Sequence, residues 1–356
     1  MKNRETLTQE AIALLKNLIE TQSFSSEEEH TAALIEKWFT ANEIPFEREN
    51  NNIWAFNATF DKSKPTLLLN SHHDTVRPNQ AYTKDPLKAI VEDGKLYGLG
   101  SNDAGGCLVS LLATFVHFYS SKNLPYNIVM VASAEEESSG KKGLNSVLKS
   151  LPELECAIVG EPTLMQLAIA EKGLLVLDVK VKGTPSHAAH QNDDNALYKS
   201  IPVMEWFKNY TFEKISEQLG PVKMTVTQIN AGKQHNVVPS ECDLVVDIRV
   251  NDCYTNHEIL AIVKENIKAE VTPRSMNLSS SSIPVSHGLV QAGIALGRTT
   301  YGSPTLSDQS VLSCKSLKLG PGDTLRSHSA DEFIYLNEIE EGIDLYIKIL
   351  TDFLKK

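Results

Sequence analysis

The stretch TLLLNSHHDTV, residues 66–76, decides our interpretation of the fold. Its apolar run, Leu67–Leu69, is short and continuous and ends at the polar residue Asn70. Such runs are typical of strands that are buried on both faces of a parallel sheet. His72 and Asp74 follow directly. We therefore expect a buried strand that brings metal-binding or ionisable side chains to its carboxyl end.

The surrounding sequence alternates strands with helices. Two more apolar runs, NIVMVAS at 127–133 and CAIVG at 156–160, resemble the first. Apolar residues recur at helical spacing within 11–19 and 32–38, and residues 105–119 are apolar enough for a buried helix. This alternation predicts an α/β fold with a mixed, mainly parallel sheet that is covered by helices.

A different pattern begins after the third apolar run. In LLVLDVKVK, residues 174–182, and in CDLVVDIRV, residues 242–250, apolar and polar residues alternate. That alternation is typical of strands exposed on one face, and in mid-chain it indicates an inserted α+β module. We expect a discontinuous catalytic domain, residues 1–173 and 286–356, which is interrupted by a smaller domain at 174–285.

Composition excludes several classes of function. Of 356 residues, 34 are Lys or Arg and 45 are Asp or Glu, so the formal net charge is -11. Such a chain is poorly suited to nucleic acid or an anionic membrane. It lacks an apolar signal core and any run near the roughly 18 apolar residues of a membrane span. Its five cysteines form no C-x-x-C pair and fit reduced thiols. We expect a cytoplasmic protein that acts on small molecules.

Ionisable side chains follow the strand-like runs at comparable places. In open α/β sheets, functional groups collect outside the carboxyl ends of the strands, so we expect these side chains to converge. They are His72 and Asp74, Asp103 in YGLGSNDAGG, the triplet Glu135, Glu136 and Glu137, Glu161 in VGEPT, and His328 in a later loop.

Each of these features also has a simpler explanation. A single histidine at a strand end is more often structural than a ligand, and a Glu triplet is usually a solvated turn. The Gly-rich segment could bind phosphate, but it lacks the ending of a P-loop and the spacing of a dinucleotide fingerprint. Taken together, two imidazoles and three carboxylates suit a pair of divalent ions, with one carboxylate bridging them. We therefore favour a two-metal site.

These motifs resemble those of the dinuclear zinc deacylases and peptidases, a family that includes acetylornithine deacetylase, succinyl-diaminopimelate desuccinylase and aminoacylase. The resemblance extends over about residues 8–350. It implies two bound divalent ions, with zinc as the preferred metal and cobalt or manganese as alternatives. It also implies that Glu136 is the general base that activates water. The implied ligands are His72, Asp103 and Glu161 for one metal, and Asp103, Glu137 and His328 for the other.

The Glu triplet allows two alignments with this family. In the first, Glu136 is the base and Glu137 the ligand, whereas a slip of one residue would give these roles to Glu135 and Glu136. The length of the preceding strand and the spacing to Gly143 favour the first alignment. The resemblance also implies a cis peptide after Asp103.

Further residues gain roles from the resemblance. Asp74 would accept a hydrogen bond from the second ring nitrogen of the first ligand and fix its tautomer. His187, in KGTPSHAAH, would stabilise the tetrahedral intermediate, often across a dimer. Asn236 in NVVP and Arg249 in DIR would bind substrate, since a guanidinium suits an α-carboxylate. Arg249 could instead simply pair with Asp247.

The resulting expectation is a metal-dependent hydrolase of N-acyl amino acids. The preferred substrate is N-acetylornithine or an N-acylcitrulline in arginine biosynthesis, and the inserted domain would be a lid through which a homodimer forms. Alternatives are succinyl-diaminopimelate desuccinylase and a dipeptidase. A non-catalytic, metal-free relative is a different class, and the presence of all five candidate ligands and both candidate bases argues against it.

Overall fold

The computed structural model describes residues 2–355, which form two compact units. The first contains the chain up to Ile169, residues 282–301 and the chain from Ser307 onwards. The second contains residues 170–281 and 302–306. Its main segment begins and ends four residues before the expected range of 174–285, and the short segment 302–306 was not expected to join it.

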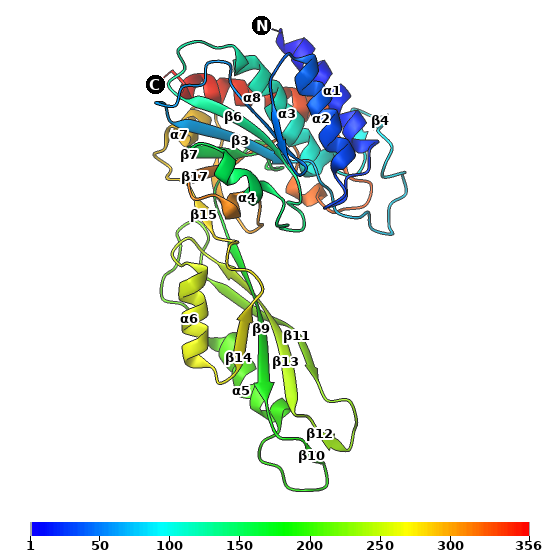
Figure 1. Ribbon diagram of the computed structural model, residues 1–356, viewed down its shortest axis with the longest axis vertical. Helices are drawn as coiled ribbons and strands as arrows, with labels where there is room; N and C mark the ends of the chain where they lie inside the picture. Colours follow the sequence, from blue (N-terminus) through cyan, green and yellow to red (C-terminus); the bar gives the residue numbers. More distant parts are fainter. Residues whose placement is uncertain (1, 356) are drawn as a thin grey trace. The chain divides into compact units, whose positions relative to one another are not determined.

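The central sheet has nine strands among the described residues (Figure 1). Its four middle strands, β6, β3, β7 and β17, are mutually parallel, and antiparallel strands flank them. The predicted fold class, a mixed and mainly parallel sheet, is therefore confirmed. In spatial order the strands are β1 (Glu47–Glu49), β2 (Asn52–Phe56), β6 (Asn127–Ser133), β3 (Thr66–His72), β7 (Leu154–Val159), β17 (Lys315–Lys318), β8 (Leu167–Glu171) and β15 (Ser281–Ser282), with β16 (Thr300–Ser303) paired to β8.

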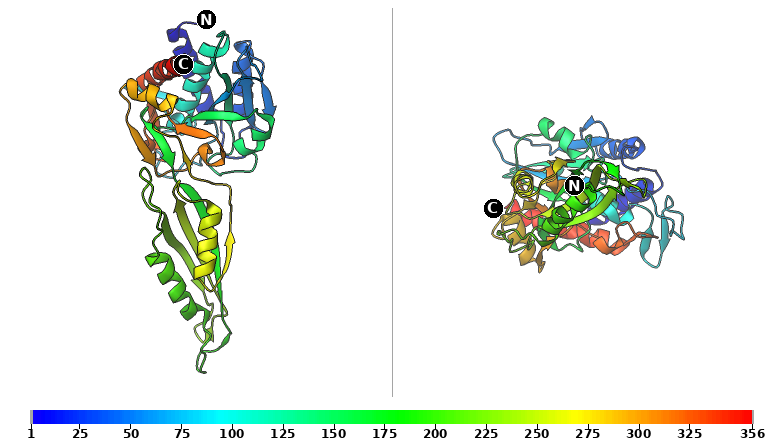
Figure 2. Two further views of the ribbon diagram at one scale, coloured as in Figure 1. Left: turned by 90° about the vertical axis from the view of Figure 1, so that its left-hand side faces the viewer. Right: turned by 90° about the horizontal axis from the view of Figure 1, so that it is seen from below.

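Helices cover both faces of this sheet. Successive side chains of a strand point to opposite faces, and accordingly Leu67 and Leu69 join one buried cluster while Leu68 joins another. The first cluster includes α1, α3 and α8, which pack against one another (Figures 1 and 2). The second includes α4. The helices are α1 (Arg4–Ile19), α2 (Glu29–Ala41), α3 (Gly106–Tyr119), α4 (Leu144–Val147), α7 (Gly288–Ala295) and α8 (Leu336–Phe353).

Short elements complete the first unit. The segment η1 (Ser101–Gly105) leads into α3, and the peptide bond between Asp103 and Ala104 is cis, as expected. A small sheet joins β4 (Ile90–Glu92), β5 (Lys95–Tyr97) and β18 (Phe333–Tyr335). Single helical turns are η2 (Leu148–Ser150), η3 (Asp308–Val311) and η4 (Thr324–Arg326).

The second unit is built on a four-stranded antiparallel sheet. Along β9 and β13, buried residues alternate with more exposed ones, which confirms the predicted one-sided strands. The buried side chains pack against α5 and α6 in one cluster. The elements are β9 (Gly173–Lys182), β10 (Ser186–His187), α5 (Ala196–Asn209), β11 (Lys223–Ala231), β12 (Val237–Val238), β13 (Glu241–Val250), α6 (Asn256–Asn266) and β14 (Glu270–Pro273).

Candidate metal centre

The parallel strands bring three of the five predicted ligands, His72, Glu137 and Glu161, to one edge of the sheet. Asp103 and His328 reach the site differently from what we expected, because Asp103 lies in η1 after a strand of the separate small sheet and His328 lies in a loop. His72 is the last residue of β3 and lies opposite Ser133, the last residue of β6. Glu136 and Glu137 therefore follow the end of β6 within four residues, and Glu161 follows the end of β7 within two. Because carboxyl ends of parallel strands meet at one edge, side chains from distant parts of the chain become neighbours.

Asp103 lies between two imidazoles. Its Oδ1 is 3.4 Å from Nε2 of His72, and its Oδ2 is 3.7 Å from Nε2 of His328. Glu161 Oε1 lies 3.6 Å from the His72 nitrogen, and Glu137 Oε2 lies 3.0 Å from the His328 nitrogen. The five predicted ligands thus form two groups that share one carboxylate.

The surroundings of the His72 ring indicate that a cation binds here. It is 1% exposed, and its Nε2 has no hydrogen-bond partner among residues 2–355. Buried polar atoms are nearly always paired, so an unpaired nitrogen facing carboxylates needs an explanation. A divalent cation supplies one, because imidazole nitrogen and carboxylate oxygens are common ligands for zinc and related ions. The residues present therefore fit the metals that the sequence implies.

The three residues of the Glu triplet have different surroundings. Glu136 Oε2 lies 3.9 Å from Nε2 of His72 and can form a metal-binding group with it and Glu161. Glu135 is directed elsewhere: its carboxylate accepts hydrogen bonds from the Ser26 hydroxyl and the Lys142 N–H. The structure thus brings Glu136 and Glu137 to the cluster.

Burial and crowding shift the pKa values of the cluster. Burial raises the pKa of Glu161 to about 8, and the nearby charge of Asp103 acts in the same direction. Burial also raises the pKa of Glu136 well above its usual range. Hydrogen bonding to Glu137 raises the pKa of His328 to about 9. Several acids in one buried site repel each other, and bound divalent cations would remove this repulsion.

Comparisons with known proteins identify the family. The sequence pattern of Peptidase family M20/M25/M40 matches residues 68–352, which include every predicted metal ligand. The chain belongs to this family. M20 membership makes it a hydrolase that acts on amide bonds, and the donor set described above is consistent with a family of metal-dependent enzymes.

Individual relatives of this M20 chain are distant. It is 26% identical to an acetylornithine deacetylase of Shigella sonnei, covering 96% of this chain and 97% of the relative. It is 23% identical to a succinyl-diaminopimelate desuccinylase of Acidiphilium cryptum, covering 95% and 97%. Among solved structures, an M20 family metallo-carboxypeptidase from Sulfolobus solfataricus matches with a TM-score of 0.77 at 15% identity, covering 98% of this chain and 100% of that one. These likenesses confirm the fold.

Asp74 makes more contacts than the sequence suggested. Nδ1 of His72 lies 3.0 Å from the main-chain oxygen of Asp74 and 3.4 Å from its carboxylate, so the backbone is the nearer acceptor. The carboxylate accepts the N–H groups of Glu136 at 3.0 Å and Glu137 at 3.2 Å, and the Ser25 hydroxyl at 2.6 Å. Asp74 therefore holds the backbone of the candidate base as well as the first imidazole.

We predict that Asp74→Asn weakens zinc binding about 10- to 100-fold, the usual effect of losing a partner that orients a ligand. The amide would turn an NH₂ group toward one of the two N–H donors and lose that hydrogen bond. Calorimetric zinc titration measures the effect. Asp61→Asn is the control, because within residues 2–355 the Asp61 carboxylate accepts hydrogen bonds only from the nearby Ser63. Equal zinc affinity in both variants would contradict the prediction.

The other predicted residues lie in the second unit. His187 and Asn236 are brought together there, because β10 pairs with β12 and the N–H of Ala188 donates to the main-chain oxygen of Asn236 at 2.9 Å. The Arg249 guanidinium donates to both carboxylate oxygens of Asp247, at 2.9 and 3.1 Å. In the structure Arg249 therefore pairs with Asp247 of its own strand, which is the simpler of the two explanations given above.

Two buried carboxylates near the site were not predicted. Asp308 accepts the Ser133 hydroxyl at 2.5 Å, and burial raises its pKa to about 6. Glu332 is 2% exposed and accepts main-chain N–H groups from the segment that contains Asp103. Both residues lie in polar stretches that resemble ordinary loops, so no local pattern distinguishes them.

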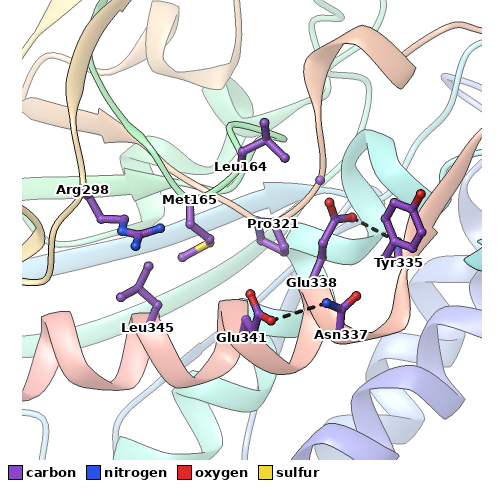
Figure 3. Close-up of a pocket in the computed structure, with 10 residues that line it drawn as sticks. Leu164, Met165, Arg298, Pro321, Tyr335, Asn337, Glu338, Glu341 and Leu345 are labelled. Carbon is purple, nitrogen blue, oxygen red and sulfur yellow. Dashed lines mark hydrogen bonds between the residues drawn. The ribbon is translucent and has the colours of Figure 1, made fainter. Parts of the chain in front are cut away.

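A separate pocket lies beside the start of α8 (Figure 3). Its volume is about 390 Å³, and none of its lining residues is a predicted metal ligand. Figure 3 shows the hydrogen bond that the Glu338 carboxylate accepts from the main-chain N–H of Tyr335. This hydrogen bond caps the N-terminus of α8. The pocket is lined by Leu164, Met165, Arg298, Pro321, Gly322, Tyr335, Asn337, Glu338, Glu341 and Leu345.

No helix within residues 2–355 combines the length and apolar character that crossing a membrane requires.

Proposed function

We propose that this M20 chain is a two-metal hydrolase of N-acyl amino acids. The observation that carries the proposal is the position of Asp103, whose two oxygens face His72 and His328 separately. A carboxylate in that position can bridge two cations. We assign His72, Asp103 and Glu161 to one ion, and Asp103, Glu137 and His328 to the other, with zinc as the first choice of metal.

The bound ions would polarise the amide carbonyl and lower the pKa of a water molecule. Glu136 is the group that takes the proton from that water and later delivers it to the leaving amine. The distance of 3.9 Å between its Oε2 and Nε2 of His72 supports this assignment. The hydrogen bonds of Glu135 to the Ser26 hydroxyl and the Lys142 N–H support giving this role to Glu136 and not to Glu135.

The residues of the second unit complete the proposal. We assign His187 to the oxygen that becomes negative in the tetrahedral intermediate. Asn236, which directly precedes β12 and accepts the Ala188 N–H through its main-chain oxygen, would contact substrate. Arg249 would bind the substrate carboxylate, for which it must exchange its present partner, Asp247. We also propose a cytoplasmic homodimer that forms through this unit, and sedimentation that shows monomer alone would contradict the dimer.

The proposed substrate is N-acetylornithine or an N-acylcitrulline. The similarity to the Shigella sonnei acetylornithine deacetylase supports it. A second candidate, N-succinyl-diaminopimelate, is supported by the similarity to several desuccinylases, including that of Acidiphilium cryptum. Both substrates present an amide next to a free carboxylate, and so does a dipeptide.

Amide hydrolysis by purified protein reconstituted with zinc tests the proposal. The substrates to compare are N-acetylornithine, N-acetylcitrulline, their succinyl analogues, N-succinyl-diaminopimelate and a dipeptide. We expect one acyl amino acid to be hydrolysed well above the others, and Glu136→Ala to abolish that activity. Failure of all of them with two zinc ions bound would reject the substrate class. A protein that binds no zinc would reject the mechanism.

A further inference from the structure

The loop that carries His328 is attached to the segment that carries Asp103 on both sides of the histidine. Before it, the side chain of Asn102 forms a reciprocal pair with the backbone of Asp323: Nδ2 donates to the Asp323 oxygen at 3.1 Å, and the Asp323 N–H donates to Oδ1 at 3.0 Å. After it, Glu332 contacts the same segment. The segment that carries Asp103 and the loop that carries His328 are thus held together by hydrogen bonds between side chains and main chain.

Glu332 makes an unusual set of contacts for a buried carboxylate. Its Oε1 accepts the N–H groups of Asn102 at 2.8 Å and Asp103 at 2.9 Å, and its Oε2 accepts the N–H of Gly100 at 3.2 Å. These donors lie in and just before η1, where Asp103 and Ala104 depart from helical φ and ψ, so the segment does not pair these N–H groups as a regular helix would. A buried carboxylate supplies the missing acceptors through charge-assisted hydrogen bonds.

The backbone of His328 itself needs support. It has a φ of +58°, in the left-handed region that is uncommon for residues other than glycine. Conformations of this kind persist when the surrounding structure determines them. Attachment at Asp323, five residues earlier, and at Glu332, four residues later, provides that support. The imidazole lies 3.7 Å from Asp103 and 3.0 Å from Glu137.

We propose that Glu332, assisted by Asn102, is a positioning residue that sets the spacing between Asp103 and His328 and so preforms the second metal position. This inference rests on the proposed function, because it takes Asp103 and His328 as ligands. It assigns to Glu332 no contact with metal or substrate. Glu332 acts by holding the main chain of Asp103 and the loop that carries His328.

Glu332→Gln in the full-length chain is the direct test. Glutamine keeps the shape but has one acceptor oxygen, so its NH₂ group would face either Gly100 or the Asn102 and Asp103 pair. Titration of metal-free protein with Zn²⁺ should show the second ion bound about 10- to 100-fold more weakly, as when ligand orientation is lost. The first ion, which also has His72 and Glu161, should be affected less. The visible spectrum of the Co²⁺-loaded variant should change accordingly.

Asp331→Asn is the matched control. This neighbouring carboxylate also accepts two main-chain N–H groups, but from Thr83 and Lys84, both at 2.8 Å, and not from the Asp103 segment. We expect it to lower the thermal midpoint of the metal-free protein without weakening the second ion. Equal weakening by Asp331→Asn would show that general loosening of the loop is responsible and would overturn the inference.

Asn102→Ala provides a second route if Glu332→Gln does not fold. It removes the reciprocal pair of hydrogen bonds with Asp323. We expect it, like Glu332→Gln, to weaken binding of the second Zn²⁺ ion more than binding of the first. Wild-type affinity for both ions in the folded variants would overturn the inference. A wild-type protein that binds fewer than two Zn²⁺ ions would instead reject the proposed function, so the two failures are distinguishable.

Discussion

Glu136→Gln should reduce kcat for amide hydrolysis about 10²- to 10⁴-fold, the contribution typical of a general base, while both metals stay bound. Glutamine matches the shape of the side chain but cannot take a proton from water. Because Glu136 is not among the ligands that we assign, the zinc content should not change. Steady-state kinetics on the best substrate, with zinc measured on the same samples, checks both parts.

Glu135→Gln is the matched control for that experiment. It makes the same chemical change at the preceding residue, whose carboxylate bonds to Ser26 and Lys142 and is absent from the metal cluster. We expect its kcat to remain near that of the wild type. If Glu135→Gln were inactive and Glu136→Gln active, the other alignment of the triplet would be correct, and the base would have to be reassigned.

Asp103→Asn should reduce the number of tightly bound ions from two to one. An amide offers one oxygen where the carboxylate offers two, and the structure directs those two oxygens at different imidazoles. Loss of a shared ligand should weaken the second ion by more than the roughly 100-fold expected from losing an orienting partner, and activity should fall with it. Zinc stoichiometry after dialysis, together with kcat, measures the effect.

Asp85→Asn is the control for Asp103→Asn, because across residues 2–355 the Asp85 carboxylate accepts a hydrogen bond only from the nearby Leu87 N–H. It should bind two ions with unchanged affinity. Retention of two tightly bound ions in Asp103→Asn would show that the carboxylate does not bridge. Some other group would then have to connect the two metals.

The first unit was largely predictable because its decisive signals are local. The apolar run at 67–69 forms β3, and its neighbours on both sides are the strands formed by the two similar runs. Once parallel strands are expected, the position of His72 at a strand end follows from the general behaviour of such sheets. The ligands that follow strand ends can then be located without knowledge of contacts between distant parts of the chain.

Other features depend on contacts that no local pattern contains. Residues 302–306 join the second unit, where Gly302 lies against the main chain of Gln218 with no room for a side chain. Glu332 resembles an exposed loop residue in sequence, although it is buried and accepts three N–H groups. For Arg249 the residues allowed two partners, and only the geometry shows that Asp247 is its present one.

The strands that flank the inserted segment have an architectural consequence. β8 ends at Glu171 and β15 begins at Ser281, yet the two strands are neighbours in the central sheet, and the Ile283 N–H donates to the Ile169 oxygen at 2.9 Å. The chain leaves and re-enters the sheet at adjacent positions, as it would through a hairpin. Domain insertion succeeds at such sites because the host fold needs only its two ends kept close. The central sheet therefore keeps its strand order on either side of an insertion of more than one hundred residues, and only the short segment 302–306 joins the second unit from elsewhere in the chain.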